Sequence, residues 1–225
     1  MLPGMDKSDP SYRGQSGYNA TMLAIYDMWV LKFMTKAVWK VPVALGVERY
    51  RQHMGHRHLD VGPGTGYFIE KADPPPGTEI TLLDPNTTVL RHVAKRLKEW
   101  HPITVEADVM KPLPVDGPFD SAAFSFVLHC LRGPEGKKAV AVRNIADVLG
   151  PEGVLFGGTV LGLRGNHTKS ALAFLRAANN RGDFDNVDDT PEGLRRILEM
   201  SFSAVDVDVV GSAALFAAAR PRSRS

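Results

Sequence analysis

The sequence predicts an α/β fold in which a mostly parallel sheet carries helices on both faces. Apolar runs typical of strands alternate with segments of helical periodicity from about residue 56 to residue 200, and this alternation favours a parallel sheet. Residues 154–161 form a continuous apolar run, as expected of a central strand that is buried on both sides. Two further strands flank Gly211-Ser212, which predicts an antiparallel hairpin.

The first half of the chain is expected to begin with helices and to continue with three strands. Apolar residues recur at helical spacing over 19–40, which predicts one or two helices, and another helix is expected over 43–53. Three consecutive prolines, Pro74-Pro75-Pro76, must end the short helix that follows the first strand. Residues 88–100 have the pattern of an amphipathic helix. The strands are expected at 56–61, 79–84 and 103–106.

The second half of the chain continues the alternation. A helix over 135–149 is expected to stop at Gly150-Pro151-Glu152-Gly153, because glycine and proline both end helices. The helix expected over 191–200 has Pro191 in its first turn, directly after the capping residue Thr190. Valines alternate with acidic residues over 204–210, which suits a half-exposed strand. The other elements are expected to be strands at 121–128, 154–161 and 213–219 and a helix at 170–180.

Composition narrows the class of protein. A chain of 225 residues with 44% apolar residues fits one domain with a sizeable core and a small appendage. The net charge of +2 is close to balanced and does not call for a nucleic-acid partner. No apolar run approaches the roughly 18 residues that a membrane span needs. Residues 1–17 have no apolar stretch typical of a secretion signal, so we expect a cytoplasmic protein.

A glycine-rich segment carries most of the chemical information. Residues 58–68 read HLDVGPGTGYF, which is a buried strand, a glycine-rich turn and the start of a helix. Without side chains at Gly62, Gly64 and Gly66, a ligand can approach the backbone closely, and helix N-termini present free N–H groups. The pattern is typical of a nucleotide site. Its spacing differs from both the dinucleotide fingerprint and the Walker A loop.

Acidic residues follow the next two strands at regular intervals. Asp84 ends the second strand, 24 residues after Asp60, where a carboxylate can accept hydrogen bonds from both hydroxyls of a ribose. Pro85-Asn86 then breaks the strand and offers a helix cap. Asp108 follows the third strand. In a parallel sheet, all these residues are expected at the carboxyl edge, where ligands bind.

These landmarks together resemble the motifs of the class I S-adenosylmethionine-dependent methyltransferases. The segment Asp60–Gly66 is similar to their motif I, and Pro118-Phe119-Asp120-Ser121 is similar to the start of their fourth strand. The resemblance covers about residues 56–219. It implies a seven-stranded doubly wound sheet of order 3-2-1-4-5-7-6 with the last strand antiparallel. It also implies three parts: a helical cover over 1–54, a methyltransferase domain over 55–220 and a basic tail over 221–225.

The resemblance further implies S-adenosyl-L-methionine as methyl donor and S-adenosyl-L-homocysteine as product. Asp108 would then contact the adenine amino group. The implied cofactor-binding residues are Asp60, Gly62, Pro63, Gly64, Thr65, Gly66, Asp84, Pro85, Asn86, Asp108, Val109 and Phe126.

Methyl transfer from a sulfonium is an in-line displacement, so the protein must mainly position the reactants and exclude water. His129, after the fourth strand, is the candidate general base, because imidazole takes up a proton near neutral pH. Its other interpretation is a side chain that only lines the pocket. The aromatic residues Tyr18, Tyr26 and Trp29 could fold over the cofactor as a lid that contacts the acceptor. Their other interpretation is that they only anchor a helix to the core. Two later loops supply the remaining candidate acceptor contacts, Arg164, Asn180 and Phe184.

Other kinds of site have weaker support. His53, His56 and His58 lack the cysteine or carboxylate that would complete a metal site, so no metal is expected. The single cysteine, Cys130, excludes an intrachain disulfide and is interpreted as a buried, inert thiol. The segment Leu128-His129-Cys130-Leu131 also lacks the motif of enzymes that methylate amino groups of nucleic-acid bases.

The leading hypothesis is transfer of a methyl group to an O, N, S or C atom of a small-molecule metabolite, by a monomer or homodimer. A protein side chain or terminus is an alternative acceptor. A catalytically silent, cofactor-binding partner subunit is a further alternative, although the intact glycines and acids argue against it. An aminopropyltransferase would need more carboxylates than Asp183 and Asp185 provide. The acceptor itself is not identified by the sequence.

Overall fold

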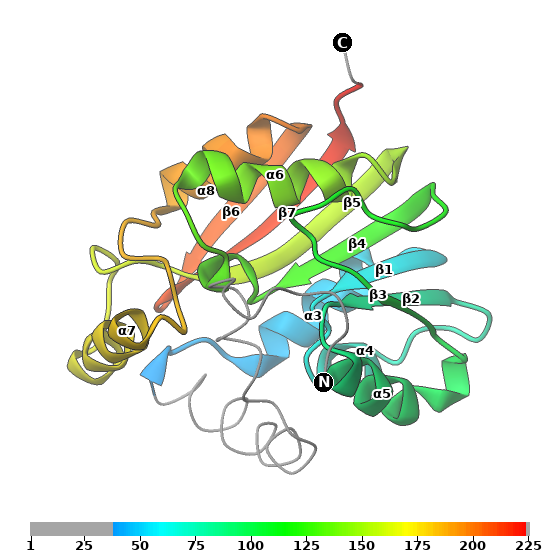
Figure 1. The fold of residues 1–225 in the computed structure, drawn as a ribbon, viewed down its shortest axis with the longest axis horizontal. Coiled ribbons are helices and arrows are strands. Elements are labelled where there is room, and N and C mark those ends of the chain that lie inside the picture. The colour runs from blue at the N-terminus through cyan, green and yellow to red at the C-terminus, as the bar shows by residue number, and fades with distance from the viewer. Residues whose placement is uncertain (1–37, 224–225) are drawn as a thin grey trace.

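The computed structural model describes residues 38–223, which form one seven-stranded sheet with helices on both faces (Figure 1). The strand order is β3-β2-β1-β4-β5-β7-β6, which confirms the predicted order. Strands β1 to β5 pair in parallel, whereas β7 is antiparallel to both of its neighbours, β5 and β6. The strands are β1 Arg57–Val61, β2 Glu79–Asp84, β3 Ile103–Glu106, β4 Phe119–Ser125, β5 Leu149–Val160, β6 Phe202–Val210 and β7 Ala213–Pro221.

Helices cover the two faces unequally. Helices α3, α4 and α5 lie on one face, α6 and α8 lie on the other, and α7 lies beyond the carboxyl ends of β5 and β6 (Figure 1). The α-helices are α3 Val43–His53, α4 Tyr67–Ala72, α5 Thr87–Arg96, α6 Glu135–Ala146, α7 Lys169–Arg181 and α8 Pro191–Glu199. Two short 3-10 helices, η2 Lys98–Trp100 and η3 Leu128–Cys130, complete the elements used below.

The alternation of side chains along each strand builds two apolar cores. Phe124 of β4 faces α6 and α8, and Phe156 of β5 faces α3, α4 and α5; both side chains are fully buried. Burial of one such side chain contributes about 1.5–3 kcal/mol. In β1, Leu59 faces the first of these cores. Its neighbours His58 and Asp60 therefore point to the opposite face, although both are polar.

Several element boundaries differ from those predicted. Strand β4 ends at Ser125 rather than at residue 128, because Phe126 adopts a left-handed conformation (φ 59°) and its N–H bonds to Gly158 O at 2.6 Å. The apolar residues that follow belong to η3. The predicted helix over 88–100 is divided into α5 and η2 at Leu97.

The segment Gly150-Pro151-Glu152-Gly153 does not separate a helix from a strand, as the sequence suggested. It lies within β5, which begins at Leu149. The pairing with β4 shifts there: Phe119 pairs with Leu149, and Ser121 pairs with Val154. The extra residues are accommodated as an irregularity in an otherwise regular parallel pair.

The described residues that precede β1 pack on the sheet. Helix α3 contacts α4 and β5, so the predicted boundary after residue 54 does not coincide with a break in packing. The rest of the predicted helical cover, including Tyr18, Tyr26 and Trp29, lies outside the described residues and stays a prediction. Within residues 38–223, no helix combines the length and apolar character needed to cross a membrane.

Candidate active site

The glycine-rich loop joins β1 to α4 in the way that the sequence predicts. Gly62, Gly64 and Gly66 all have positive φ angles, of 69°, 57° and 75°. A Cβ atom on Gly62 would lie 2.5 Å from Val127 Cγ2, so this glycine is required by packing. A Cβ atom on Gly64 would meet no atom of residues 38–223 within 4 Å, so this glycine has an open side toward that part of the chain. The loop therefore combines a packed base with an open side that can receive a ligand.

Asp60 of β1 lies just before this loop in the chain and is 1% exposed. Its Oδ2 accepts a hydrogen bond from the hydroxyl of Tyr50 at 2.8 Å. Its Oδ1 is buried and finds no hydrogen-bond partner among residues 38–223. A buried carboxylate oxygen without a partner is costly, so Oδ1 is available to accept a hydrogen bond from a ligand.

Asp84 ends β2 and is largely buried. Burial raises the pKa of this carboxyl to about 7, although the hydrogen bond from Asn86 N–H to Oδ1 at 2.7 Å opposes the shift. The side chain of Asn86 caps α5 by accepting from Thr88 N–H at 2.9 Å. The strand, Pro85 and the cap together hold the Asp84 carboxylate at the carboxyl edge of the sheet.

The remaining predicted cofactor residues lie at the ends of β3 and β4. Asp108 Oδ1 accepts from Met110 N–H at 2.9 Å, which fixes the turn after β3. Asn144 of α6 donates to Val109 O at 2.8 Å and ties this turn to the helix layer. Phe126 follows β4 directly. These residues, Asp60 and Asp84 all end or follow neighbouring parallel strands, so they share one edge of the sheet.

His129 lies in η3, after β4, and is 4% exposed. Its Nδ1 lies 3.4 Å from Val160 N and 3.4 Å from Thr159 Oγ1, both at the end of β5. Burial, aided by the charge of Lys138, lowers the pKa of His129 to about 3. The imidazole is therefore neutral at neutral pH.

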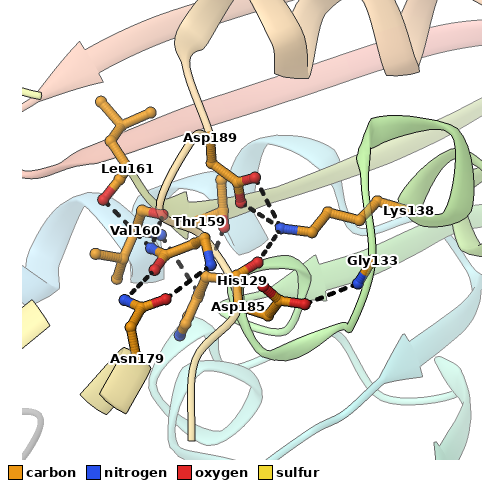
Figure 2. A network of polar contacts seen from close by, with 10 residues as sticks. His129, Gly133, Lys138, Thr159, Val160, Leu161, Asn179, Asp185 and Asp189 are labelled. Carbon is orange, nitrogen blue, oxygen red and sulfur yellow. Dashed lines mark hydrogen bonds and ion pairs between the residues drawn. The ribbon is translucent and has the colours of Figure 1, made fainter. Parts of the chain in front are cut away.

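A network of polar contacts holds the loop between α7 and α8 against His129 (Figure 2). Lys138 of α6 is 2% exposed; its Nζ lies 2.6 Å from Asp189 Oδ2 and donates to Asp185 O at 2.7 Å. Asp185 N–H in turn donates to His129 O at 2.8 Å, and its carboxylate accepts from Gly133 N–H at 2.8 Å. The loop and η3 are thus fixed to each other by charged and backbone groups.

A second set of contacts ties the same loop to the end of β5. Asn186 is 1% exposed and donates to Val160 O at 3.0 Å and to Leu161 O at 3.3 Å. Asn179 of α7 donates to Asn186 Oδ1 at 2.9 Å (Figure 2). Phe184 lies between Asn179 and Asn186 in the chain, so these hydrogen bonds fix its position.

An aromatic cluster results at this end of the sheet, and its members are Trp39, Phe126, His129, Phe174 and Phe184. The rings of His129 and Phe184 are 4.3 Å apart, centroid to centroid, in an edge-to-face arrangement. Phe126 lies 6.4 Å from His129, and Trp39 lies 5.3 Å from Phe174. Such pairs favour flat apolar partners with a polar edge.

The comparison with known proteins agrees with this geometry. Residues 59–155 match a family described as methyltransferase domain. The chain is 34% identical over 221 residues to the physcion biosynthesis cluster O-methyltransferase of Aspergillus chevalieri, with 97% of this chain and 100% of the relative covered. It is 37% identical over 197 residues to the demethylluteothin O-methyltransferase of Streptomyces thioluteus, covering 84% and 83%.

The chain belongs to the S-adenosylmethionine-dependent methyltransferases.

Solved structures show the same fold. The complex of DhpI with S-adenosyl-L-homocysteine (SAH) has a TM-score of 0.67 at 19% identity and covers 97% of this chain and 100% of that chain. The N-methyltransferase NodS from Bradyrhizobium japonicum WM9, also with SAH, has a TM-score of 0.65 at 19% identity, covering 96% and 100%. The methyltransferase uses S-adenosylmethionine as its methyl donor. The open side at Gly64 and Asp60 Oδ1, which has no hydrogen-bond partner within residues 38–223, fit this cofactor, whose amino-acid end carries an ammonium group.

The structure brings only part of the predicted acceptor site together. His129 and Phe184 are in contact, whereas Arg164 and Asn180 are exposed. Phe174 was missed by the sequence analysis, because one aromatic residue in an amphipathic helix does not differ from a core residue. Tyr50 was missed for the same reason.

Two further expectations concern Cys130 and the histidines. Cys130 is exposed, so its interpretation as a buried thiol is wrong: it is the last residue of η3, at the end of the short turn that follows β4. Within residues 38–223, no group of three or more metal-binding side chains is found. A hollow of about 920 Å³ lies at the opposite edge of the sheet, near Arg57, Glu79 and Trp100, and none of the predicted site residues lines it.

The pKa of Asp84 gives a testable pH dependence. A ribose hydroxyl donates more strongly to the ionised carboxyl, so protonation should compete with cofactor binding. With a pKa of about 7, the affinity for SAH should be about tenfold weaker at about pH 6 than at about pH 8. In the ligand-free protein, the same raised pKa costs stability as the pH rises toward 7, because the unfolded chain ionises more readily.

Calorimetric titration at a series of pH values measures the effect. The matched variant Asp84→Asn cannot ionise at this position, and its weaker binding should show no such step. A wild-type affinity that is the same on both sides of pH 7 would contradict the assignment of Asp84 to the cofactor.

Proposed function

We propose that this methyltransferase transfers the methyl group to an oxygen atom of a small aromatic metabolite. The observation that carries the proposal is the aromatic cluster around an uncharged His129, at the edge of the sheet shared with the cofactor residues. The names of two relatives, the physcion biosynthesis cluster O-methyltransferase and the demethylluteothin O-methyltransferase, support oxygen as the acceptor atom.

The cofactor supplies a methyl group that is already activated by its positive sulfur. The residues of this chain then need to bind the acceptor, orient its oxygen and exclude water. The aromatic cluster offers faces and edges on which a planar acceptor can pack. An acidic phenol or enol loses its proton readily, so a strong base is not required.

His129 can orient the acceptor oxygen. Because Val160 N–H is directed at Nδ1, the tautomer with hydrogen on Nε2 is favoured. In this form the ring donates a hydrogen bond through Nε2. Its role as a general base, expected from the sequence, stays a prediction that the pH profile tests.

If His129 orients the acceptor, wild-type turnover should show no step attributable to this residue across about pH 5 to 8, since its pKa is about 3. His129→Ala should lower kcat/KM for the acceptor by about tenfold, the value of a lost hydrogen bond, and His129→Gln should restore part of it. Turnover is measured at saturating cofactor. A step near neutral pH that both variants abolish would instead show that His129 acts as a base.

The acceptor class is tested with purified protein, S-adenosylmethionine and a panel of acceptors. The panel contains phenolic and enolic polyketide-like aromatics, aromatic and aliphatic amines, thiols and short peptides. SAH formation and the product mass are measured. We expect methylation of the oxygen-bearing aromatics. Methylation of peptides alone would favour the protein-methylating alternative, and SAH binding without turnover of any acceptor would favour a silent partner subunit.

A further inference from the structure

Five polar side chains are buried in or beside the otherwise apolar face covered by α3 and α4. Tyr50 comes from α3, and His58 and Asp60 come from β1. Ser121 and Ser125 come from β4. Tyr50, His58, Asp60 and Ser121 are at most 2% exposed. Burial of this many polar groups is unfavourable unless hydrogen bonds offset it, so their arrangement needs an explanation.

Hydrogen bonds connect most of the group. Ser121 Oγ accepts from Gly55 N–H at 2.8 Å and lies 2.8 Å from His58 Nδ1. His58 Nε2 makes no hydrogen bond among residues 38–223 and lies 3.8 Å from Asp60 Oδ2. Ser121 thus holds His58 at Nδ1, with Nε2 on the side of the Asp60 carboxylate.

Tyr50 makes the one short contact to this carboxylate among the described residues, with its hydroxyl 2.8 Å from Oδ2. Its ring is fixed on two sides, stacked 5.7 Å from Phe68 and edge-to-face 5.0 Å from Phe156. Burial and the charge of Asp60 raise the pKa of Tyr50 well above its usual range, so the hydroxyl remains a donor. The Tyr50 hydroxyl and His58 Nε2 therefore both face Oδ2.

We propose that Tyr50 is a positioning residue for the cofactor: it holds Asp60 by Oδ2, so that Oδ1 stays available for the ammonium group at the amino-acid end of S-adenosylmethionine. The inference rests on the assignment of the glycine-rich loop to this cofactor. It gives α3 a role in donor binding, whereas the sequence placed this helix in a cover over the acceptor.

The test compares two ligands, one with and one without the amino-acid end that would contact Asp60. SAH carries the ammonium group, and methylthioadenosine lacks the whole amino-acid part. Calorimetric titration of Tyr50→Phe should show an SAH affinity about tenfold weaker than wild type, the size expected for a hydrogen bond to a charged group. The affinity for methylthioadenosine should stay within about twofold of wild type.

A double-mutant cycle separates positioning from general damage to the fold. In an Asp60→Asn background, Tyr50→Phe should have little further effect on SAH binding, because the residue through which it acts has lost its charge. Equal losses for both ligands, or additive losses in the cycle, would overturn the inference. A folded wild type that binds neither ligand would instead overturn the cofactor site itself.

Discussion

Replacing Lys138 with methionine is expected to lower the free energy of unfolding by about 3 kcal/mol, at the lower end of the range for a broken buried ion pair. The side chain of Lys138 is 2% exposed, and its partner Asp189 is 21% exposed. Methionine fills a similar volume but leaves the carboxylate and Asp185 O without their donor. Burial raises the pKa of Asp189 and Lys138 opposes that shift, so the variant carboxyl should also take up a proton more readily.

Denaturant unfolding, followed by far-ultraviolet circular dichroism, measures the change. Lys137→Met is the matched control, because Lys137 is the exposed neighbour on the same helix and should change stability by less than about 0.5 kcal/mol. The loop that carries Phe184 should also become looser, so the KM for the acceptor should rise more than the affinity for SAH falls. Equal stability of the two variants would show that the Lys138–Asp189 pair contributes nothing net to the fold.

Gly64→Ala is expected to weaken SAH binding by more than about hundredfold, or about 3 kcal/mol, while the protein stays folded. The added methyl group would enter the open side of the loop, where no atom of the described residues lies within 4 Å. The φ of 57° costs an alanine about 1–2 kcal/mol of stability. The loss of SAH binding free energy should therefore be larger than the loss of folding stability.

Gly62→Ala provides the contrast. Its Cβ atom would lie 2.5 Å from Val127 Cγ2, so this variant should lose stability as well as affinity. Melting temperature and SAH titration are measured for both variants. A Gly64→Ala protein with wild-type affinity would show that the cofactor does not occupy the open side of the loop.

The parts of the site that the sequence predicts are those whose signal is local. The three glycines stand within five residues, and Asp84 stands at the end of an apolar run, so each can be recognised without knowing the fold. Strand β4 was predicted three residues too long because Val127 and Leu128 continue its apolar pattern, although the chain has already turned at Phe126. A hydrophobic pattern does not indicate where a residue adopts a left-handed backbone conformation.

The sequence does not predict which polar side chains contact each other. Lys138 and Asp189 are 51 residues apart, and nothing near either residue indicates a partner. Tyr50 and Asp60 are 10 residues apart, but Tyr50 has the spacing of an ordinary apolar residue of a helix that covers a sheet. Only the packing of α3 against the sheet shows that the Tyr50 hydroxyl meets a carboxylate.

The order of the strands has a consequence for how such an enzyme can diversify. Most residues expected to hold the donor lie at or after the ends of β1, β2 and β3, on one half of the sheet, whereas the aromatic cluster, with Phe126, follows β4 and β5 and includes α7, on the other half. The two halves meet at the β1–β4 pair. Mutations in α7 and the loop after it can therefore alter the choice of acceptor during evolution without rebuilding the part that recognises the shared methyl donor.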